Sequence, residues 1–276
     1  MQAKLDTAIT LLSSASGTGP ADLDLYYGGD ATKWLHLAHT IKARYWLHVA
    51  EREGQTAYQN ALADAQQGLQ QGEDFLGIAG DSPTSTNLWY QFTVIQRAGY
   101  VFAGAFLVNL LQQRNDPRLE QFFMPNDQGQ FVGAEPGDQT AAFSGFTVSE
   151  NPAFRQPIVT WQENQLIIAE AAFQTGDQGL ALSSVNVVRA DVGLPALSSV
   201  TLNEIMEEKY IVLFQNTEVW NDYKRTCYPP ITPAPGSSEV PGRLLYAVGE
   251  RDANPNIPAP GDQPARNWND PNACTP

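Results

Sequence analysis

Apolar side chains recur at intervals of three and four residues along most of the chain, which is the spacing of amphipathic α-helices. The alternation that marks strands is convincing nowhere, and only short pieces near residues 131 and 146 suggest it. The pattern therefore predicts an all-α fold. The expected helices cover residues 5–14, 30–53, 56–70, 89–113, a short helix from 116, 161–174, 177–192 and 201–224.

Residues that begin or end helices support these ranges. Asp30 and Asp116 stand where an N-cap is expected, because an Asp side chain can accept hydrogen bonds from the free N–H groups of a first helical turn. Thr201 and Glu204 have the spacing of a capping box. Gly176 is placed to close a helical hairpin, since glycine readily takes the left-handed conformation at a helix end.

That hairpin carries small residues where two helices must approach closely: Ala169, Ala172 and Ala181. This packing is typical of tetratricopeptide-like hairpins, although the sequence shows no clean 34-residue period. Long irregular stretches rich in Gly, Pro, Asp and Ser separate the helices, at 71–87, 125–157 and 229–276. We therefore expect one domain over residues 1–276, with 229–276 as an irregular tail packed on the helices.

Composition and charge exclude several classes of function. The chain has 276 residues, 42% of them hydrophobic, and a formal net charge of −14. An acidic surface repels the phosphates of nucleic acids and the head groups of anionic lipids. No apolar run is long enough to span a membrane, and the opening residues form an amphipathic pattern rather than an export signal.

The three histidines lie on one predicted helix, which raises the question of a metal site. His48 falls on the apolar stripe, whereas His36 and His39 fall outside it, so the three side chains do not converge. The helix is better explained as an amphipathic packing helix with histidines on its polar face. We expect no metal and no cofactor.

Catalytic motifs are not recognisable in the sequence. It has no nucleophile elbow, no phosphate-binding glycine-rich loop and no zinc motif. Acidic pairs such as Glu218 and Asp222 are four residues apart on a helix, where ion pairing explains them as well as catalysis does. The chain is therefore interpreted as a binding protein and not as an enzyme.

Several segments, taken in order, resemble one known family. They are "DATKWLHLAHTIKAR" (30–44), "NLWYQF" (87–92), "NDPRLEQFF" (115–123), "IIAEAAFQTGD" (167–177), "EEKYIVLFQNTEVWNDYKRTCYP" (207–229) and "VPGRLLYAVGERDANP" (240–255). In this order they resemble motifs of the SusD/RagB family of outer-membrane nutrient-binding lipoproteins. His39 stands where that family usually has Asn, which points to a packing and capping position.

The resemblance implies a function and a location. Members capture oligosaccharides, or in some branches peptides, at the surface of the outer membrane and pass them to a SusC-type TonB-dependent transporter. Their contact with the membrane is a lipid anchor, which is not present in this sequence. Because the matches begin where a typical member is already well advanced, we expect a C-terminal part or a shortened member. The alternatives are a helical-repeat protein-interaction scaffold and a helical-fold glycan hydrolase.

Aromatic side chains beside loops are the candidate ligand contacts, since flat aromatic faces suit sugars. They are Trp89, Tyr90, Tyr100 and Trp268. Arg118 and Arg225 recur in the family's motifs, and the structural role of bridging buried carboxylates is favoured for both over stacking on a ligand.

The two cysteines, Cys227 and Cys274, both lie in irregular, proline-rich surroundings and lack the spacing of a zinc site. A disulfide between them would tie the tail to the helices and would suit an oxidising, exported location. The alternative is two free thiols that never meet.

Overall fold

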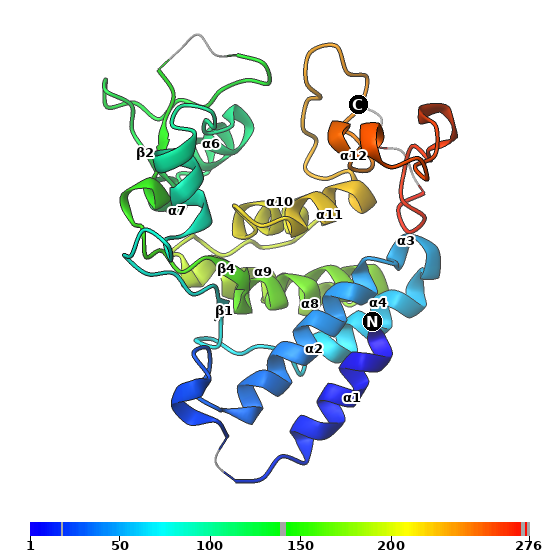
Figure 1. Cartoon of the computed structure of the whole chain (residues 1–276). Helices are drawn as coiled ribbons and strands as arrows, with labels where there is room; N and C mark the ends of the chain where they lie inside the picture. The colour runs from blue at the N-terminus through cyan, green and yellow to red at the C-terminus, as the bar shows by residue number, and fades with distance from the viewer. Residues whose placement is uncertain (18, 139–141, 272–273, 275–276) are drawn as a thin grey trace.

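Helices that follow one another along the chain stack side by side into a tetratricopeptide-like array (Figure 1). The computed structural model describes residues 1–17, 19–138, 142–271 and 274. Its α-helices are α1 (Gln2–Ser13), α2 (Ala31–Leu47), α3 (Ala50–Glu53), α4 (Gln55–Ala65), α5 (Leu88–Tyr90), α6 (Ala105–Gln113), α7 (Arg118–Phe122), α8 (Trp161–Thr175), α9 (Gln178–Asp191), α10 (Leu202–Val212), α11 (Glu218–Thr226) and α12 (Val248–Ala253). α1 packs on α2, α2 on α4, α4 on α8, and α8 on both α9 and α10. The prediction of an all-α fold is confirmed.

Short strands, three 3-10 turns and one short π-helix complete the described fold. The strands form two antiparallel pairs, β1 with β4 and β2 with β3. The first pair joins the two ends of the long insertion between α4 and α8. These elements are β1 (Phe75–Leu76), β2 (Phe123–Met124), β3 (Gly145–Phe146), β4 (Pro157–Val159), the 3-10 turns η1 (Ala21–Leu23), η3 (Thr147–Glu150) and η4 (Pro260–Asp262), and the π-helix η2 (Gln91–Gln96).

The helix caps expected at Asp30, Gly176 and Thr201 are confirmed. The Asp30 carboxylate accepts hydrogen bonds from the first turn of α2, and the Thr201–Glu204 capping box opens α10. Gly176 adopts φ 92° between α8 and α9, as the hairpin requires. The apolar core of this hairpin lies where its small residues were expected, with Ala169 and Ala181 fully buried.

Three predicted helices are interrupted in the structure, and at each break the chain contacts a part that is distant in sequence. The helix expected over 30–53 ends at Leu47, and the carbonyl of His48 instead accepts a hydrogen bond from Asn269 of the tail. The helix expected over 201–224 breaks at Gln215, whose φ is 61° and whose carbonyl accepts a hydrogen bond from Gln156. Both breaks lie in sequences whose apolar spacing continues without interruption.

The third interruption creates a loop near the candidate site. The helix expected over 89–113 is replaced by α5, η2 and a non-helical stretch before α6, with φ 78° at Gly99. Within that stretch the backbone of Ala103 and Ala105 pairs with Ala134. Near 131 the described residues form this bridge and a backbone hydrogen bond from Ser144 to Val132 but no strand, whereas the strand suggested near 146 is β3.

The chain leaves α4 through a close approach to two other helices. The side chains of Thr40 and Asn164 hydrogen bond to each other and to the backbone around Leu69. A Cβ atom added to Gly68 would overlap both side chains. The helix expected to reach residue 70 therefore ends at Ala65, and the turn after it is held by α2 and α8.

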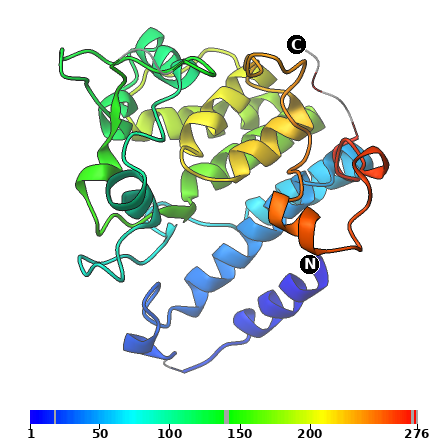
Figure 2. The ribbon, with the colours of Figure 1, turned by 45° about the horizontal axis from the view of Figure 1, so that its top comes forward.

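The described part of the tail, residues 229–271 and 274, lies across the ends of the helices and contains α12 (Figure 2). Cys227 and Cys274 are joined by a disulfide, with their Cα atoms 5.2 Å apart. Lys224 forms a buried ion pair with Asp270 at 2.8 Å. These contacts fix the tail to α11, and that the whole chain is one domain remains our proposal.

The described residues include no helix that is long and apolar enough to cross a bilayer.

Candidate functional site

An aromatic pocket of about 230 Å³ opens where the insertion between α4 and α8 meets the α10–α11 connection. Aromatic and aliphatic side chains from segments far apart in sequence form its walls. We call it the aromatic pocket, and its lining is Trp89, Val101, Phe102, Gly104, Leu107, Phe123, Phe146, Tyr210, Leu213, Phe214, Gln215 and Val219.

The rings at the base of this pocket hold each other in place. The β2–β3 pairing sets Phe123 opposite Phe146, and both rings lie against Phe214, with ring centroids 5.2 and 6.3 Å away. Phe214 also stacks on Phe122 at 4.5 Å. Because Phe123 and Phe146 are buried in the core of the insertion, the base of the pocket is part of a close-packed core.

Trp89 forms one wall and is oriented by a capped turn. The Asn87 side chain accepts hydrogen bonds from the N–H groups of Trp89 and Tyr90, and its amide donates to the carbonyl of Phe154. This places the half-buried Trp89 ring against the core of the insertion. Phe102, which also lines the pocket, is 37% exposed, and Ile95 of η2 is an exposed apolar side chain of the same insertion.

The four aromatic residues predicted as ligand contacts do not form one site. Of the four, Trp89 lines the aromatic pocket. Tyr90 is half-buried, and Tyr100 is exposed with the Arg97 guanidinium 5.6 Å from its ring centre. Trp268 lies in the tail, with the guanidinium of Arg52 on α3 5.3 Å from its ring centre. Figure 1 shows α3 on the opposite side of the molecule from α6.

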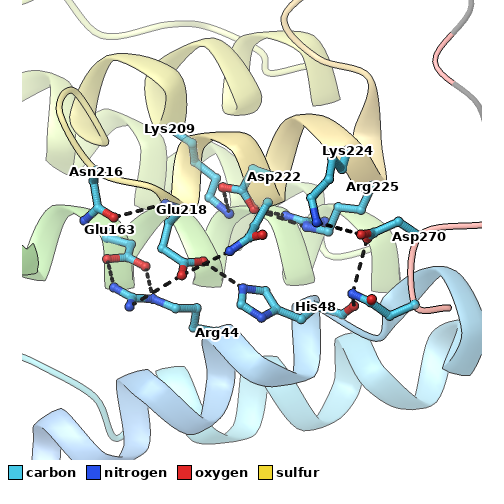
Figure 3. Close-up of polar contacts among 12 residues, drawn as sticks. Arg44, His48, Glu163, Lys209, Asn216, Glu218, Asp222, Lys224, Arg225 and Asp270 are labelled. Carbon is cyan, nitrogen blue, oxygen red and sulfur yellow. Dashed lines mark hydrogen bonds and ion pairs between the residues drawn. The ribbon is translucent and has the colours of Figure 1, made fainter. Parts of the chain in front are cut away.

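Ion pairs fill the seam between α2 and α8 on one side and α11 on the other (Figure 3). The Arg44 guanidinium binds Glu163 through two hydrogen bonds of 2.7 and 2.6 Å. Glu218 lies between Arg44 and His48 and accepts a 2.7 Å hydrogen bond from the His48 imidazole. This half of the seam therefore joins the start of the helical array to α11.

The deeper half of the seam is a four-residue network of opposite charges. Glu170, which has no exposed surface, binds both Arg225 and Lys209. Asp222 binds the same two cations, Lys209 at 2.8 Å and Arg225 at 2.6 Å. Every charge in this network has a partner of opposite sign, so it is a structural element.

A second buried cluster surrounds Glu208 of α10. Its carboxylate binds the guanidinium groups of Arg114, Arg118 and Arg189. Arg118 also binds Asp116 at 2.6 Å. The bridging of carboxylates predicted for Arg118 and Arg225 is therefore confirmed, and neither side chain is free to stack on a ligand.

The histidines have three separate acidic partners. His36 binds Glu73 at 2.8 Å, and His39 binds Asp64 at 3.0 Å. His39 is buried, so its assignment to a polar helix face is wrong: α4 covers it, and Asp64 supplies the hydrogen bond it needs. In the described parts of the chain, no three metal-binding side chains come together.

Acid should weaken this packing through the carboxylates of the network. Burial alone would raise the pKa of Asp222, but the charges of Lys209 and Arg225 outweigh it and lower the pKa from 3.8 to about 2. A carboxylate whose pKa is lower in the folded than in the unfolded state stabilises the fold at pH values above its unfolded-state pKa. That contribution, on the order of 2 kcal/mol for one such group, is lost as the pH falls from about 4 towards 2.

The measurement is the free energy of unfolding from urea titrations at a series of pH values. We expect a plateau near neutral pH and a fall below about pH 4, and Asp222→Asn should make that fall shallower. A stability that stays constant down to pH 2 in the unmodified chain would contradict the assignment.

Comparisons with known proteins agree with this fold. The model of a family described as "Starch-binding associating with outer membrane", SusD-like, matches residues 1–179. A solved SusD-like protein from Bacteroides thetaiotaomicron is 23% identical, with a TM-score of 0.72 over 91% of this chain and 66% of that one. A chitin-binding SusD homolog from Flavobacterium johnsoniae is 18% identical, with a TM-score of 0.73 over 92% of this chain and 66% of that one. A search of curated protein sequences finds no match.

The fold of this chain is a tetratricopeptide-like helical array whose long insertion carries an aromatic pocket. The chain belongs to the SusD-like family, so the predicted membership of the SusD/RagB family is confirmed. It spans 66% of the length of the solved structures named above.

Proposed function

We propose that this chain captures oligosaccharides in the aromatic pocket, at the outer-membrane surface, for import through a SusC-type TonB-dependent transporter. The observation that carries the proposal is an aromatic pocket in a chain of a family described as starch-binding and associated with the outer membrane. The chitin-binding homolog with the same fold supports a carbohydrate ligand rather than a peptide.

The pocket has the physical properties that sugar binding requires. A sugar ring has an apolar face that gains from contact with a flat aromatic surface, and a fixed ring loses little conformational entropy on binding. Trp89 and Phe102 offer such surfaces at the mouth, and Gln215 supplies an amide for hydroxyl groups. The volume suits one sugar unit, with exposed apolar side chains of the insertion, such as Phe102, available to further units.

Replacing Trp89 with Ala should lower the affinity for a bound oligosaccharide at least about tenfold, because the substitution removes one wall of the pocket. Isothermal titration calorimetry against malto-oligosaccharides and chitin oligosaccharides measures the affinity. Trp268→Ala is the matched control, since the same ring is lost far from the pocket. An affinity that depended on Trp268 and not on Trp89 would place the site on the tail.

A reducing-sugar assay on the same mixtures distinguishes binding from hydrolysis. We expect no release of reducing ends over many hours. Isolation of a TonB-dependent barrel together with the full-length protein from outer membranes tests the proposed partner.

A further inference from the structure

A second cavity, of about 480 Å³, adjoins the aromatic pocket and shares Gly104 and Tyr210 with it. It lies between α6 and α10 and is bounded by the loop 134–136 and by the start of the tail. We call it the acidic groove. Its lining is Gly104, Ala105, Phe106, Asn109, Leu110, Gln113, Ala134, Glu135, Pro136, Glu207, Tyr210, Pro230, Ile231 and Thr232.

Helix geometry gives this groove two facing walls. Phe106, Asn109 and Gln113 are three and four residues apart and so share one face of α6. Glu207 and Tyr210 share one face of α10 in the same way. The rings of Phe106 and Tyr210 meet edge to face, with centroids 5.5 Å apart. The groove therefore combines an aromatic surface with amides and carboxylates.

The charge in the groove has one sign. Its lining includes two glutamates and no lysine or arginine. Glu207 accepts a single hydrogen bond, from the amide of Asn203, and in the described part of the chain neither Glu207 nor Glu135 has a cationic partner.

The neighbouring residue makes the contrast clear. Glu208, one position along α10, is buried and binds three arginines. The arginines near α10 thus neutralise the interior carboxylate and leave the one that lines the cavity without a counterion. A cation brought by a ligand could form ion pairs there that the protein itself does not provide.

We propose that the acidic groove is a second subsite of the same ligand site, selective for a sugar that carries a protonated amine. The inference rests on the proposed function, because the amine-bearing unit belongs to the oligosaccharide held in the aromatic pocket. Tyr210, common to both cavities, contacts adjacent units of that chain. The ligand class is a partly or fully de-N-acetylated amino-sugar oligomer.

The test compares a glucosamine tetramer with its fully N-acetylated counterpart by isothermal titration calorimetry. We expect the unmodified protein to bind the amine form more tightly, and Glu207→Gln and Glu135→Gln each to lower that affinity about tenfold. The same substitutions should change the affinity for the acetylated form less than about twofold. Binding of the amine form should also weaken strongly between low salt and about 0.5 M NaCl.

The matched control is Glu53→Gln, which removes an exposed charge on α3, at the other end of the molecule from α6 (Figure 1). It should leave both affinities unchanged. Equal binding of the two tetramers, unaffected by Glu207→Gln, would overturn this inference and leave the proposed function standing. If neither tetramer bound, and no neutral glycan bound either, the proposed function itself would be overturned.

Two further outcomes would reassign the groove. Tighter binding of a lysine-rich peptide than of the glucosamine tetramer, lost in Glu207→Gln, would replace the amino-sugar assignment with a peptide. Release of reducing ends that stopped in Glu135→Gln or Glu207→Gln would make the two carboxylates catalytic and would also overturn it.

Discussion

Replacing Glu170 with Gln should lower the free energy of unfolding by about 3–5 kcal/mol, one of the two largest effects that we expect in this chain. Glu170 is fully buried and neutralises both Arg225 and Lys209. Gln keeps the shape of the side chain but removes its charge. Two buried cations would then depend on Asp222 alone, and the cost of burying charge without compensation is large. Chemical denaturation followed by circular dichroism measures the difference.

A control and a coupled variant sharpen this result. Glu120→Gln, on the exposed face of α7, should change the free energy of unfolding by less than about 0.5 kcal/mol. Lys209→Met combined with Glu170→Gln should cost at least about 1 kcal/mol less than the sum of the two single variants, because each removes part of the other's penalty. Additive effects would show that the two side chains do not form a network.

Removing the disulfide is the second large effect. Replacing both Cys227 and Cys274 with Ala should lower the free energy of unfolding by about 4 kcal/mol, because the bond closes a long loop and so restricts the unfolded chain. The two cysteines are 47 residues apart. Urea titrations of the oxidised protein, the protein in reductant and the double variant measure the effect.

The reduced protein and the double variant should unfold at the same urea concentration, and reductant should not change the stability of the variant. Mass spectrometry of unreduced peptides checks the bond directly. Two free, alkylatable cysteines in protein from its native compartment, or equal stability with and without reductant, would contradict this prediction.

Local signals in the sequence were sufficient for the helical array. Asp30, Gly176 and the Thr201 capping box each act within one helical turn of their own position, so the residues that decide the structure are neighbours in sequence. The small residues of the α8–α9 hairpin likewise act on the adjacent helix.

Long-range contacts account for what the sequence did not reveal. At the breaks near His48 and Gln215 the backbone carbonyls accept hydrogen bonds from Asn269 and Gln156, which lie 221 and 59 residues away. The spacing of apolar residues along the chain does not predict hydrogen bonds with such distant partners. The loop that contains Phe102 was not predicted, because residues 89–113 were expected to form one helix.

The aromatic pocket was predictable only in part. Trp89 could be recognised because it begins a helix after a loop, whereas Phe146 and Phe214 look like ordinary core residues in sequence. They become pocket residues because β2, β3 and the α10–α11 connection converge. Tyr100 and Trp268 were also predicted as aromatic side chains beside loops, but they do not line the pocket.

The crowding around Gly68 has a consequence for how freely this sequence can vary. In a saturation library screened for folded protein, position 68 should accept glycine almost exclusively, because even alanine would collide with Thr40 and Asn164. Alanine at 68 should be restored only when smaller residues replace both Thr40 and Asn164, because each of the two side chains alone would still overlap the added Cβ atom. The three positions should therefore change only in concert, although they are widely separated in the gene.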